Sequence, residues 1–233
     1  MILKYYCVKI KKVTFEGGLY VESGSKKISL EVIKRLPRYY RYLGDLLAGG
    51  TDRISSKELS QRMNVTASQI RQDLNCFGGF GQQGYGYNVE GLYKAIGEIL
   101  GLYEGHKTII IGAGRLGQAL ANTRSFEKRG FHLIGIFDID NKKIGTKTGE
   151  HTILDMKDLK SFMGEYKPNI AILTVPKASA NEVAKNLADW GIKGMMNFCY
   201  TDIDVPEGVV VQNVHLSDSL MMLSYQIKNE KYI

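Results

Sequence analysis

The sequence predicts an α/β protein with an N-terminal winged helix-turn-helix domain, a Rossmann-like dinucleotide-binding domain and a C-terminal helix that we expect to be domain-swapped. Three observations predict this fold class. Two short capped helices precede a glycine-rich hairpin between residues 55 and 89. A strand at 108–111 runs directly into Gly-Ala-Gly-Arg-Leu-Gly. The terminal segment 216–227 is rich in apolar residues.

Length and composition exclude several classes of protein. The 233 residues fit one large domain or two small ones, and a 44% hydrophobic share is ordinary for a globular chain. No apolar run reaches the roughly 18 residues of a membrane span, and the N-terminus lacks a secretion signal. The cysteines at 7, 76 and 199 form no CxxC pair, which argues against a metal site and a disulfide framework. We therefore expect a cytoplasmic protein without metal or membrane contact.

Most of the excess positive charge lies in residues 1–27, which hold six lysines and two glutamates. The whole chain has 31 Lys and Arg against 24 Asp and Glu, a net charge of +7. The codons of Glu16-Gly17-Gly18 can spell a bacterial ribosome-binding sequence, and Val21 follows at a suitable spacing for a GTG start. Residues 1–27 are therefore predicted to be either a disordered basic arm or a mis-annotated leader.

The first predicted domain, residues 28–105, begins with an amphipathic helix. Apolar residues recur at spacings of three and four from Ile28 to Leu47, and Pro37 predicts a kink or a new start within this helix. The basic residues Lys34, Arg35, Arg38 and Arg41 follow one another with no acid between them, a pattern typical of a solvated helix face.

Two short helices with a tight turn come next. Ser55 and Glu58 have the spacing of a capping box, Asn64-Val65 makes the break, and Thr66 caps a second helix from Ala67 to about Cys76. The polar residues of this second helix that we expect to face outward are Ser68, Gln69, Arg71, Gln72 and Asn75. Gln and Asn can read adenine edges, and Arg can read guanine or hold phosphate. The alternative is a generic helical hairpin with an ordinary polar surface.

The segment 77–89 contains five glycines alternating with aromatic residues, which predicts a β-hairpin. After a recognition helix, such a hairpin is suited to be a wing that approaches phosphates or the minor groove. A hairpin that only packs is the alternative. A last helix over residues 89–102 is followed by Gly105, which suggests the domain boundary.

The second predicted domain, residues 106–214, carries a dinucleotide-binding signature. The strand 108–111 leads into Gly112, Ala113, Gly114, Arg115, Leu116 and Gly117, a helix follows, and the next strand ends in Asp138, 21 residues beyond Gly117. The glycines permit a tight turn, close approach of the pyrophosphate and close helix–strand packing, while the acid accepts hydrogen bonds from the ribose 2′-OH. A carboxylate there favours NAD(H) over NADP(H). A Rossmann unit that packs but binds nothing is the alternative.

Two further strands are expected to end at the ligand side of the sheet. Val175 and Pro176 follow a buried strand that begins at residue 169, and Asn197 ends another that begins at residue 194. Because an open α/β sheet binds its ligand at the carboxyl ends of its strands, we expect these residues near the nicotinamide half. Residues 209–211 read as a last strand.

The sequence offers no constellation for catalysis. The four histidines, at 106, 132, 151 and 215, show no His–Asp or His–Lys arrangement, and Cys199 reads better as a small buried hydrophobe than as a nucleophile. We therefore predict that the chain is not an enzyme. Two alternatives stay open: a small NAD-dependent oxidoreductase, and a constitutive DNA-binding protein whose Rossmann unit only dimerises. The apolar segment 215–233 either completes its own domain or inserts into a partner subunit.

The order of these motifs resembles the Rex family of redox-sensing transcriptional repressors. The resemblance covers about residues 28–227 and rests on the stretches 35–41, 55–59, 68–74, 84–89, 112–117, 137–138 and 173–176. It implies a homodimer that binds AT-rich inverted-repeat operators in double-stranded DNA when NADH is low. NADH binding would close the Rossmann domains and release the DNA, with fermentation and respiration genes as targets. The implied DNA contacts are Arg38, Ser68, Gln69, Arg71, Gln72, Gln82, Gln83 and Tyr85.

The chain departs from the family pattern at its switch. The resemblance implies that an Arg of the first helix is coupled to a Tyr and to an Asp near the C-terminus. Arg41 matches the Arg, but Thr123 stands at the Tyr position and His215 at the Asp position. Asp218, one turn further on, is a candidate substitute. Dinucleotide binding is thus expected, whereas the route from NADH to DNA release is open.

Overall fold

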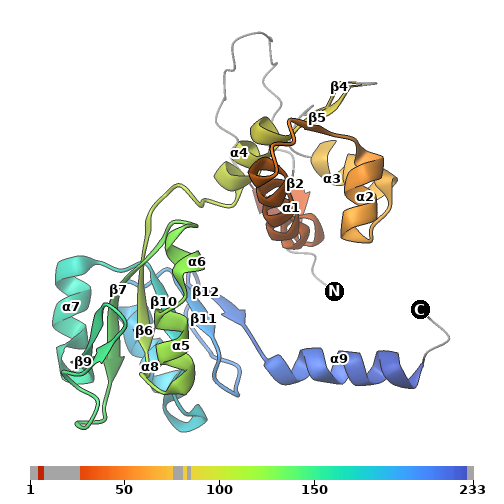
Figure 1. The fold of residues 1–233 in the computed structure, drawn as a ribbon. Helices are drawn as coiled ribbons and strands as arrows, with labels where there is room; N and C mark the ends of the chain where they lie inside the picture. The colour runs from red at the N-terminus through yellow and green to blue at the C-terminus, as the bar shows by residue number, and fades with distance from the viewer. Residues whose placement is uncertain (1–4, 8–26, 76–80, 83–84, 230–233) are drawn as a thin grey trace. The chain divides into compact units, whose positions relative to one another are not determined.

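The computed structural model describes residues 5–7, 27–75, 81–82 and 85–229 (Figure 1). The chain divides into two compact units, Met1–Tyr103 and Glu104–Ile233, close to the predicted boundary at residue 105. Of the expected leader, the structure describes only Tyr5–Cys7 and residue 27. The prediction that the leader is disordered or mis-annotated therefore falls mainly outside the described residues.

The first unit consists of helices and small antiparallel sheets. Its elements are β1 (Tyr5–Cys7), β2 (Lys27–Ser29), α1 (Leu30–Ala48), β3 (Arg53–Ile54), α2 (Ser56–Met63), α3 (Ala67–Asn75), β4 (Gly81–Gln82), β5 (Gly86–Asn88) and α4 (Val89–Ile99). β1 pairs with β2, and β5 lies between β3 and β4 in a three-stranded sheet. Together α2, α3 and this sheet make the predicted helix-turn-helix with its hairpin.

The helix boundaries of the first unit follow from local chemistry. The Ser55 side chain accepts a hydrogen bond from the Glu58 N–H, and the Glu58 carboxylate accepts one from the Ser55 N–H. The predicted capping box is therefore confirmed. Thr66 Oγ1 accepts from the Gln69 N–H and caps α3. The predicted new start at Pro37 is wrong: α1 runs through it without a break and buries Leu36 and Leu43 on one face. Burial of that face compensates for the missing proline N–H.

The second unit is a twisted, mainly parallel sheet with helices on both faces (Figure 1). Its elements are β6 (His106–Ile111), α5 (Arg115–Ala121), α6 (Arg124–Glu127), β7 (Phe131–Asp138), β8 (Lys147–Thr148), β9 (His151–Asp155), η1 (Met156–Asp158), α7 (Leu159–Tyr166), β10 (Ile170–Leu173), α8 (Lys177–Asp189), β11 (Gly194–Asn197), β12 (Val210–Asn213) and α9 (Leu216–Lys228). The sheet order is β12-β11-β10-β6-β7-β9-β8, and only β8 is antiparallel to its neighbour. The six parallel strands therefore have the 3-2-1-4-5-6 order of a Rossmann fold.

Alternate residues of the central strands fill two cores. Ile109, Ile111 and Phe137 pack with α7 and α8 on one face of the sheet, while Ile110 and Ile136 pack against the α5–α6 side. Strands buried on both faces explain the continuous apolar runs of the sequence. The order of strands reverses between β6 and β10, so the carboxyl ends of these two strands form the place where such a sheet holds its ligand.

The terminal helix α9 has no buried residue. Its exposed large apolar side chains are Leu216, Leu220, Met221, Met222, Leu223, Tyr225 and Ile227. Exposure of so many apolar residues on one helix is typical of an interaction surface. The exchange of this helix between subunits stays a prediction.

Candidate functional site

The loop after β6 forms a cradle built from backbone. Gly112 has φ +99°, and a Cβ there would lie 2.7 Å from the Thr174 carbonyl oxygen, so only glycine fits this turn. A Cβ at Gly117 would overlap the Gly112 carbonyl oxygen, so the absence of a side chain there lets α5 pack closely on the loop. A Cβ at Gly114 would meet nothing within 4 Å. The middle glycine thus faces open space, where a phosphate group can approach the backbone.

Asp138 lies at the end of β7 beside this loop and is almost completely buried. Its Oδ2 accepts from the Ala113 N–H at 2.7 Å and from Lys143 Nζ at 3.1 Å, and its Oδ1 accepts from the Asp140 N–H at 2.9 Å. Burial alone would raise the pKa of Asp138, but the hydrogen bonds from Asp140, Lys143 and Ala113 outweigh it and lower that pKa. The carboxylate is therefore ionised at neutral pH and is an acceptor for ribose hydroxyls.

The carboxyl end of β10 closes the other side of the cradle. Thr174 Oγ1 donates to the Gly112 carbonyl oxygen at 2.7 Å, and the Thr174 N–H donates to the Ile111 carbonyl at 2.9 Å. Val175 is half-buried, and exposed Pro176 is the N-cap of α8. These contacts hold β6 and β10 together at the reversal of strand order; the place of Val175 and Pro176 beside a nicotinamide stays a prediction.

Asn197 ends β11 and is fully buried. Its Nδ2 donates to the Thr201 carbonyl oxygen and to Asn213 Oδ1, both at 2.8 Å, while its Oδ1 accepts from the Cys199 N–H. The side chain thus fixes the loop after β11, and an effect on a ligand would act through that loop. Cys199 is buried, which raises the pKa of its thiol and argues against a nucleophile.

The residues of this site fit a dinucleotide whose ribose carries no 2′-phosphate. An open glycine offers room for the pyrophosphate, and Arg115 and Leu116 at the start of α5 are exposed beside it. An ionised acid stands where a ribose would lie, and it would repel a 2′-phosphate. Among the described residues, no group of three or more His, Cys, Asp or Glu side chains is arranged to hold a metal ion.

The second helix of the helix-turn-helix presents a polar face. Ser68, Arg71, Gln72 and Asn75 are exposed on α3, and Gln69 is half-buried. Arg71 donates from Nη1 to Ser56 Oγ of α2 at 3.0 Å, so its guanidinium lies at the junction of the two helices. These are the side-chain types that bind base edges and phosphates.

The hairpin and α1 carry the remaining candidates for DNA contact. Tyr85, just before β5, is 70% exposed, and Arg38 is exposed on α1 with its guanidinium 5.9 Å from the Tyr42 ring centre. The structure places Gln82 in β4 without describing its side chain, and Gln83 lies outside the described residues.

One buried acid, which the sequence reading did not assign, joins α3 to α1. Asp73 is fully buried and accepts from Arg35 Nε at 2.7 Å, Arg35 Nη2 at 2.8 Å and Tyr39 Oη at 2.9 Å. Gln69 Nε2 donates a fourth hydrogen bond at 2.8 Å. A sequence signal exists: Asp73 stands among Ile70 and Leu74 at the helical spacing of the core-facing residues.

The ion pair should make the stability of the first unit depend on pH. Burial acts to raise the pKa of Asp73, but the bonds from Arg35, Gln69 and Tyr39 outweigh it and lower that pKa. A lowered folded-state pKa stabilises the fold above the unfolded-state pKa of about 3.9, and this stability is lost as pH falls further. We expect the free energy of unfolding to fall less between pH 6 and pH 3 in Asp73→Asn than in the wild type. Thermal unfolding followed at each pH measures this difference. An equal loss in both would contradict this assignment.

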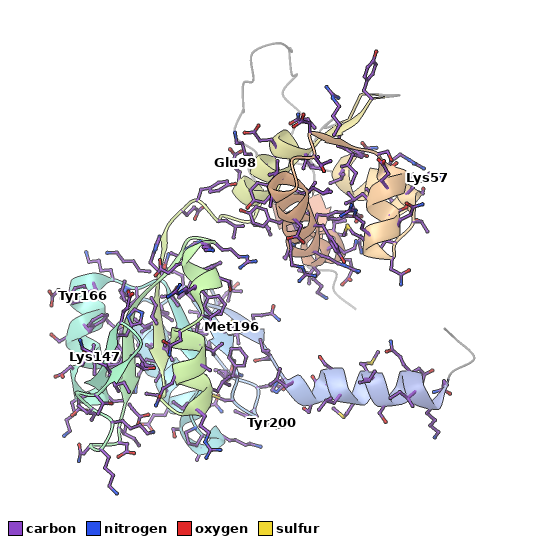
Figure 2. All side chains as sticks on the ribbon, viewed as in Figure 1. Lys57, Glu98, Lys147, Tyr166, Met196 and Tyr200 are labelled. Carbon is purple, nitrogen blue, oxygen red and sulfur yellow. The ribbon has the colours of Figure 1, made fainter. Side chains whose placement is uncertain are left out.

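The predicted switch residues are distributed over both units. Arg41 is exposed on α1, with its guanidinium 5.8 Å from the Tyr42 ring centre. In the second unit Thr123 is the N-cap of α6 and donates to the Ala119 carbonyl oxygen. His215 is the N-cap of α9, and its ring is edge-on to that of exposed Tyr200 at 5.9 Å between ring centres. Tyr200 is labelled in Figure 2. Asp218 is exposed in the first turn of α9. Coupling among these residues stays a prediction.

Comparison with known proteins covers both units. A family described as the N-terminus of putative DNA-binding proteins matches residues 27–75, and one described as a CoA binding domain matches residues 104–201. No helix in the described ranges is long and apolar enough to cross a membrane.

Curated relatives share about half of the sequence. The redox-sensing transcriptional repressor Rex of Thermoanaerobacter pseudethanolicus is 54% identical over 209 residues, which are 90% of this chain and 93% of the relative. The protein of the same name from Clostridioides difficile is 52% identical and covers 89% of this chain and 99% of its own length.

A solved structure of RSP in complex with beta-NAD+ and operator DNA is 53% identical, with a TM-score of 0.83 over 89% of this chain and 95% of its own. A second, of RSP in complex with beta-NADH, is 51% identical with a TM-score of 0.80 over 88% of this chain and 96% of its own. Given this identity over nine-tenths of its length, the chain belongs to the Rex family of redox-sensing transcriptional repressors.

Proposed function

We propose that this chain is a DNA-binding repressor that senses the NADH/NAD+ ratio in the cytoplasm, binding its operator at low NADH and leaving it when NADH binds. The observation that carries the proposal is the ionised Asp138 beside an open glycine cradle, in a chain that also has a helix-turn-helix. The relatives that carry the repressor name, and the RSP complexes with each nucleotide, support it. As a member of this family, the chain is a regulator and not an enzyme.

The dinucleotide would be held by the backbone and by one acid. Residues 112–117 would take the pyrophosphate and Asp138 the adenosine ribose hydroxyls. Val175, Pro176 and the loop fixed by Asn197 would line the nicotinamide half. The dinucleotide supplies the redox state that is sensed, while these residues bind and orient it.

The operator would be read by α3 in the major groove. We infer base contacts from Ser68, Gln69, Arg71 and Gln72, backbone contacts from Arg38, and wing contacts from Gln82, Gln83 and Tyr85. An AT-rich inverted repeat suits a two-fold dimer of such domains, because each half-site would face one recognition helix.

The dimer would be built on α9. Seven large apolar side chains are exposed on this helix, and their burial in a second copy of the chain would remove them from water. We expect Leu220→Glu to shift the protein from dimer to monomer, measured by sedimentation velocity at fixed concentration. Ser219→Glu places the same charge on a residue that is already polar and should leave the dimer intact. A dimeric Leu220→Glu protein would contradict the assignment.

The regulatory coupling would run through Arg41 in the first unit and Thr123, His215 and Asp218 in the second. Because the familiar Tyr and Asp are replaced here, we infer that Asp218 takes the place of the acid. A switch of this kind needs contacts that differ between the NADH-bound and NADH-free states.

Fluorescence anisotropy on an AT-rich inverted-repeat duplex tests the whole proposal, with NADH and then NAD+ titrated at fixed salt. We expect NADH, and not NAD+, to release the DNA. Binding that is indifferent to both nucleotides would favour a constitutive DNA-binding protein. Steady oxidation of NADH with a carbonyl substrate would favour the oxidoreductase.

A further inference from the structure

The buried carboxylate of Asp73 is hydrogen-bonded to side chains of α1 and of its own helix, α3. Its two oxygens receive four hydrogen bonds, two from Arg35, one from Tyr39 and one from Gln69. The Arg35 bonds reach both oxygens at 2.7 and 2.8 Å, which is the bidentate geometry that holds a carboxylate plane in one orientation. Since α1 supplies Arg35 and Tyr39, the carboxylate is fixed by a helix other than the one that carries it.

The fixed carboxylate also determines how the Gln69 amide is turned. An ionised carboxylate can only accept hydrogen bonds, so the nitrogen end of the amide must face Asp73, at 2.8 Å from Oδ1. One amide hydrogen is used in this bond. Among the hydrogen bonds of the described residues, none uses the other hydrogen or the carbonyl oxygen of this half-buried side chain.

One donor and one acceptor in a fixed order match the major-groove edge of adenine. Adenine presents N7 as an acceptor and its N6 amino group as a donor, and a Gln amide binds both at once. A free Gln would lose up to about 2 kcal/mol of side-chain entropy on being ordered. Because the bond to Asp73 already orders Gln69 in the free protein, binding to DNA costs less conformational entropy at this side chain.

We propose that Asp73 is a positioning residue that turns Gln69 for adenine and thereby helps to determine operator sequence, with Arg35 clamping the carboxylate. The inference rests on the proposed function, since it requires that α3 reads DNA. A positioning role of Asp73 and a merely structural role of its ion pair predict different effects on DNA selectivity. Loss of the Asp73 carboxylate should relax selectivity at one base-pair position, whereas loss of fold would weaken binding to every sequence.

A double-mutant cycle on selectivity tests this difference. Anisotropy is measured at fixed salt on an AT-rich inverted-repeat duplex and on derivatives in which each A·T pair is replaced symmetrically by G·C. We expect Gln69→Ala to lose a preference of roughly 5- to 150-fold at one position. Asp73→Asn should lose most of the preference at that same position. The double variant Gln69→Ala/Asp73→Asn should lose no more than Gln69→Ala alone.

Two controls separate positioning from charge and from folding. Glu90→Gln on α4 removes the same negative charge from an exposed ion pair with Lys94, so it should change affinity for all duplexes alike. Circular dichroism follows the helices of each variant, while NADH binding reports on the second unit. If Asp73→Asn fails to fold, Arg35→Lys takes its place, because it keeps the charge and removes the bidentate clamp. It should show the same loss at the same position.

The free protein gives an independent readout. The side-chain amide hydrogens of Gln69, followed by NMR, should exchange with water at least several-fold more slowly than those of exposed Gln61 on α2. Equal exchange, or selectivity losses at different positions for Gln69→Ala and Asp73→Asn, would overturn the inference while leaving the proposed function intact. A wild-type chain that binds none of the duplexes would overturn both.

Discussion

Replacing Asp138 by Ala is expected to weaken NADH binding by roughly 10- to 100-fold while operator binding by the nucleotide-free protein survives. Hydrogen bonds to a charged group contribute about 1.5–3 kcal/mol each, and every 1.4 kcal/mol is tenfold in affinity. Asp138 also accepts from the Ala113 N–H, so its loss frees the loop that would hold the pyrophosphate. Isothermal titration with NADH and anisotropy with the duplex measure the two quantities separately.

Two companion variants sharpen this result. Gly114→Ala adds a methyl group where nothing lies within 4 Å, so it should leave the melting temperature unchanged and still weaken NADH binding. Lys160→Ala, at an exposed position of α7, should change neither quantity. Unaltered NADH affinity in Asp138→Ala would remove the ribose assignment.

Arg71→Ala should weaken operator binding by about 1–3 kcal/mol if the guanidinium reads a base, and the loss should depend on the base pair at one position. If Arg71 instead binds phosphate, the loss of affinity should be the same for all duplex sequences. The slope of log affinity against log salt concentration should then decrease in magnitude by about one. Anisotropy at several salt concentrations distinguishes the two.

The control for Arg71 is Ser56 of α2, which accepts a hydrogen bond from its guanidinium. Ser56→Ala removes the hydrogen bond from Arg71 but leaves the guanidinium in place, so we expect a smaller loss than in Arg71→Ala. Lys94→Ala removes one positive charge of the same unit from α4 and corrects for long-range attraction. If Arg71→Ala binds as tightly as the wild type, base readout lies elsewhere on α3.

Local chemistry made much of the fold predictable. The capping box at Ser55, the Thr66 cap and the glycines of the 112–117 loop each act within a few residues, so their spacing in the chain is enough to reveal them. The apolar runs of β6 and β7 were recognisable because both faces of these strands are buried. The elements from β8 to α7 were not predicted, since β8 and β9 are short and their residues are of mixed burial.

Tertiary partners were the part that spacing could not reveal. The bonds of Asp73 to Tyr39 and Arg35 span 34 and 38 residues, and the Thr174 bond to Gly112 spans 62. The predicted new start at Pro37 is wrong because the hydrogen bond that proline cannot donate is outweighed by burial of one face of α1. Asn197 was expected at the ligand, and its full set of internal bonds could not be foreseen from its place at a strand end.

The linkage of Asp138 to the Ala113 N–H has a consequence for what a sensor of this design would report. Since the Ala113 N–H donates to Asp138, the acid and the loop 112–117 would hold the adenosine half together. That half is chemically identical in the oxidised and reduced nucleotides. Both forms would therefore compete for the same contacts, and occupancy by one form depends on the supply of the other. Discrimination between oxidation states falls to the nicotinamide end alone. The output would therefore follow a quotient of concentrations and would stay steady when the total nucleotide pool rises or falls.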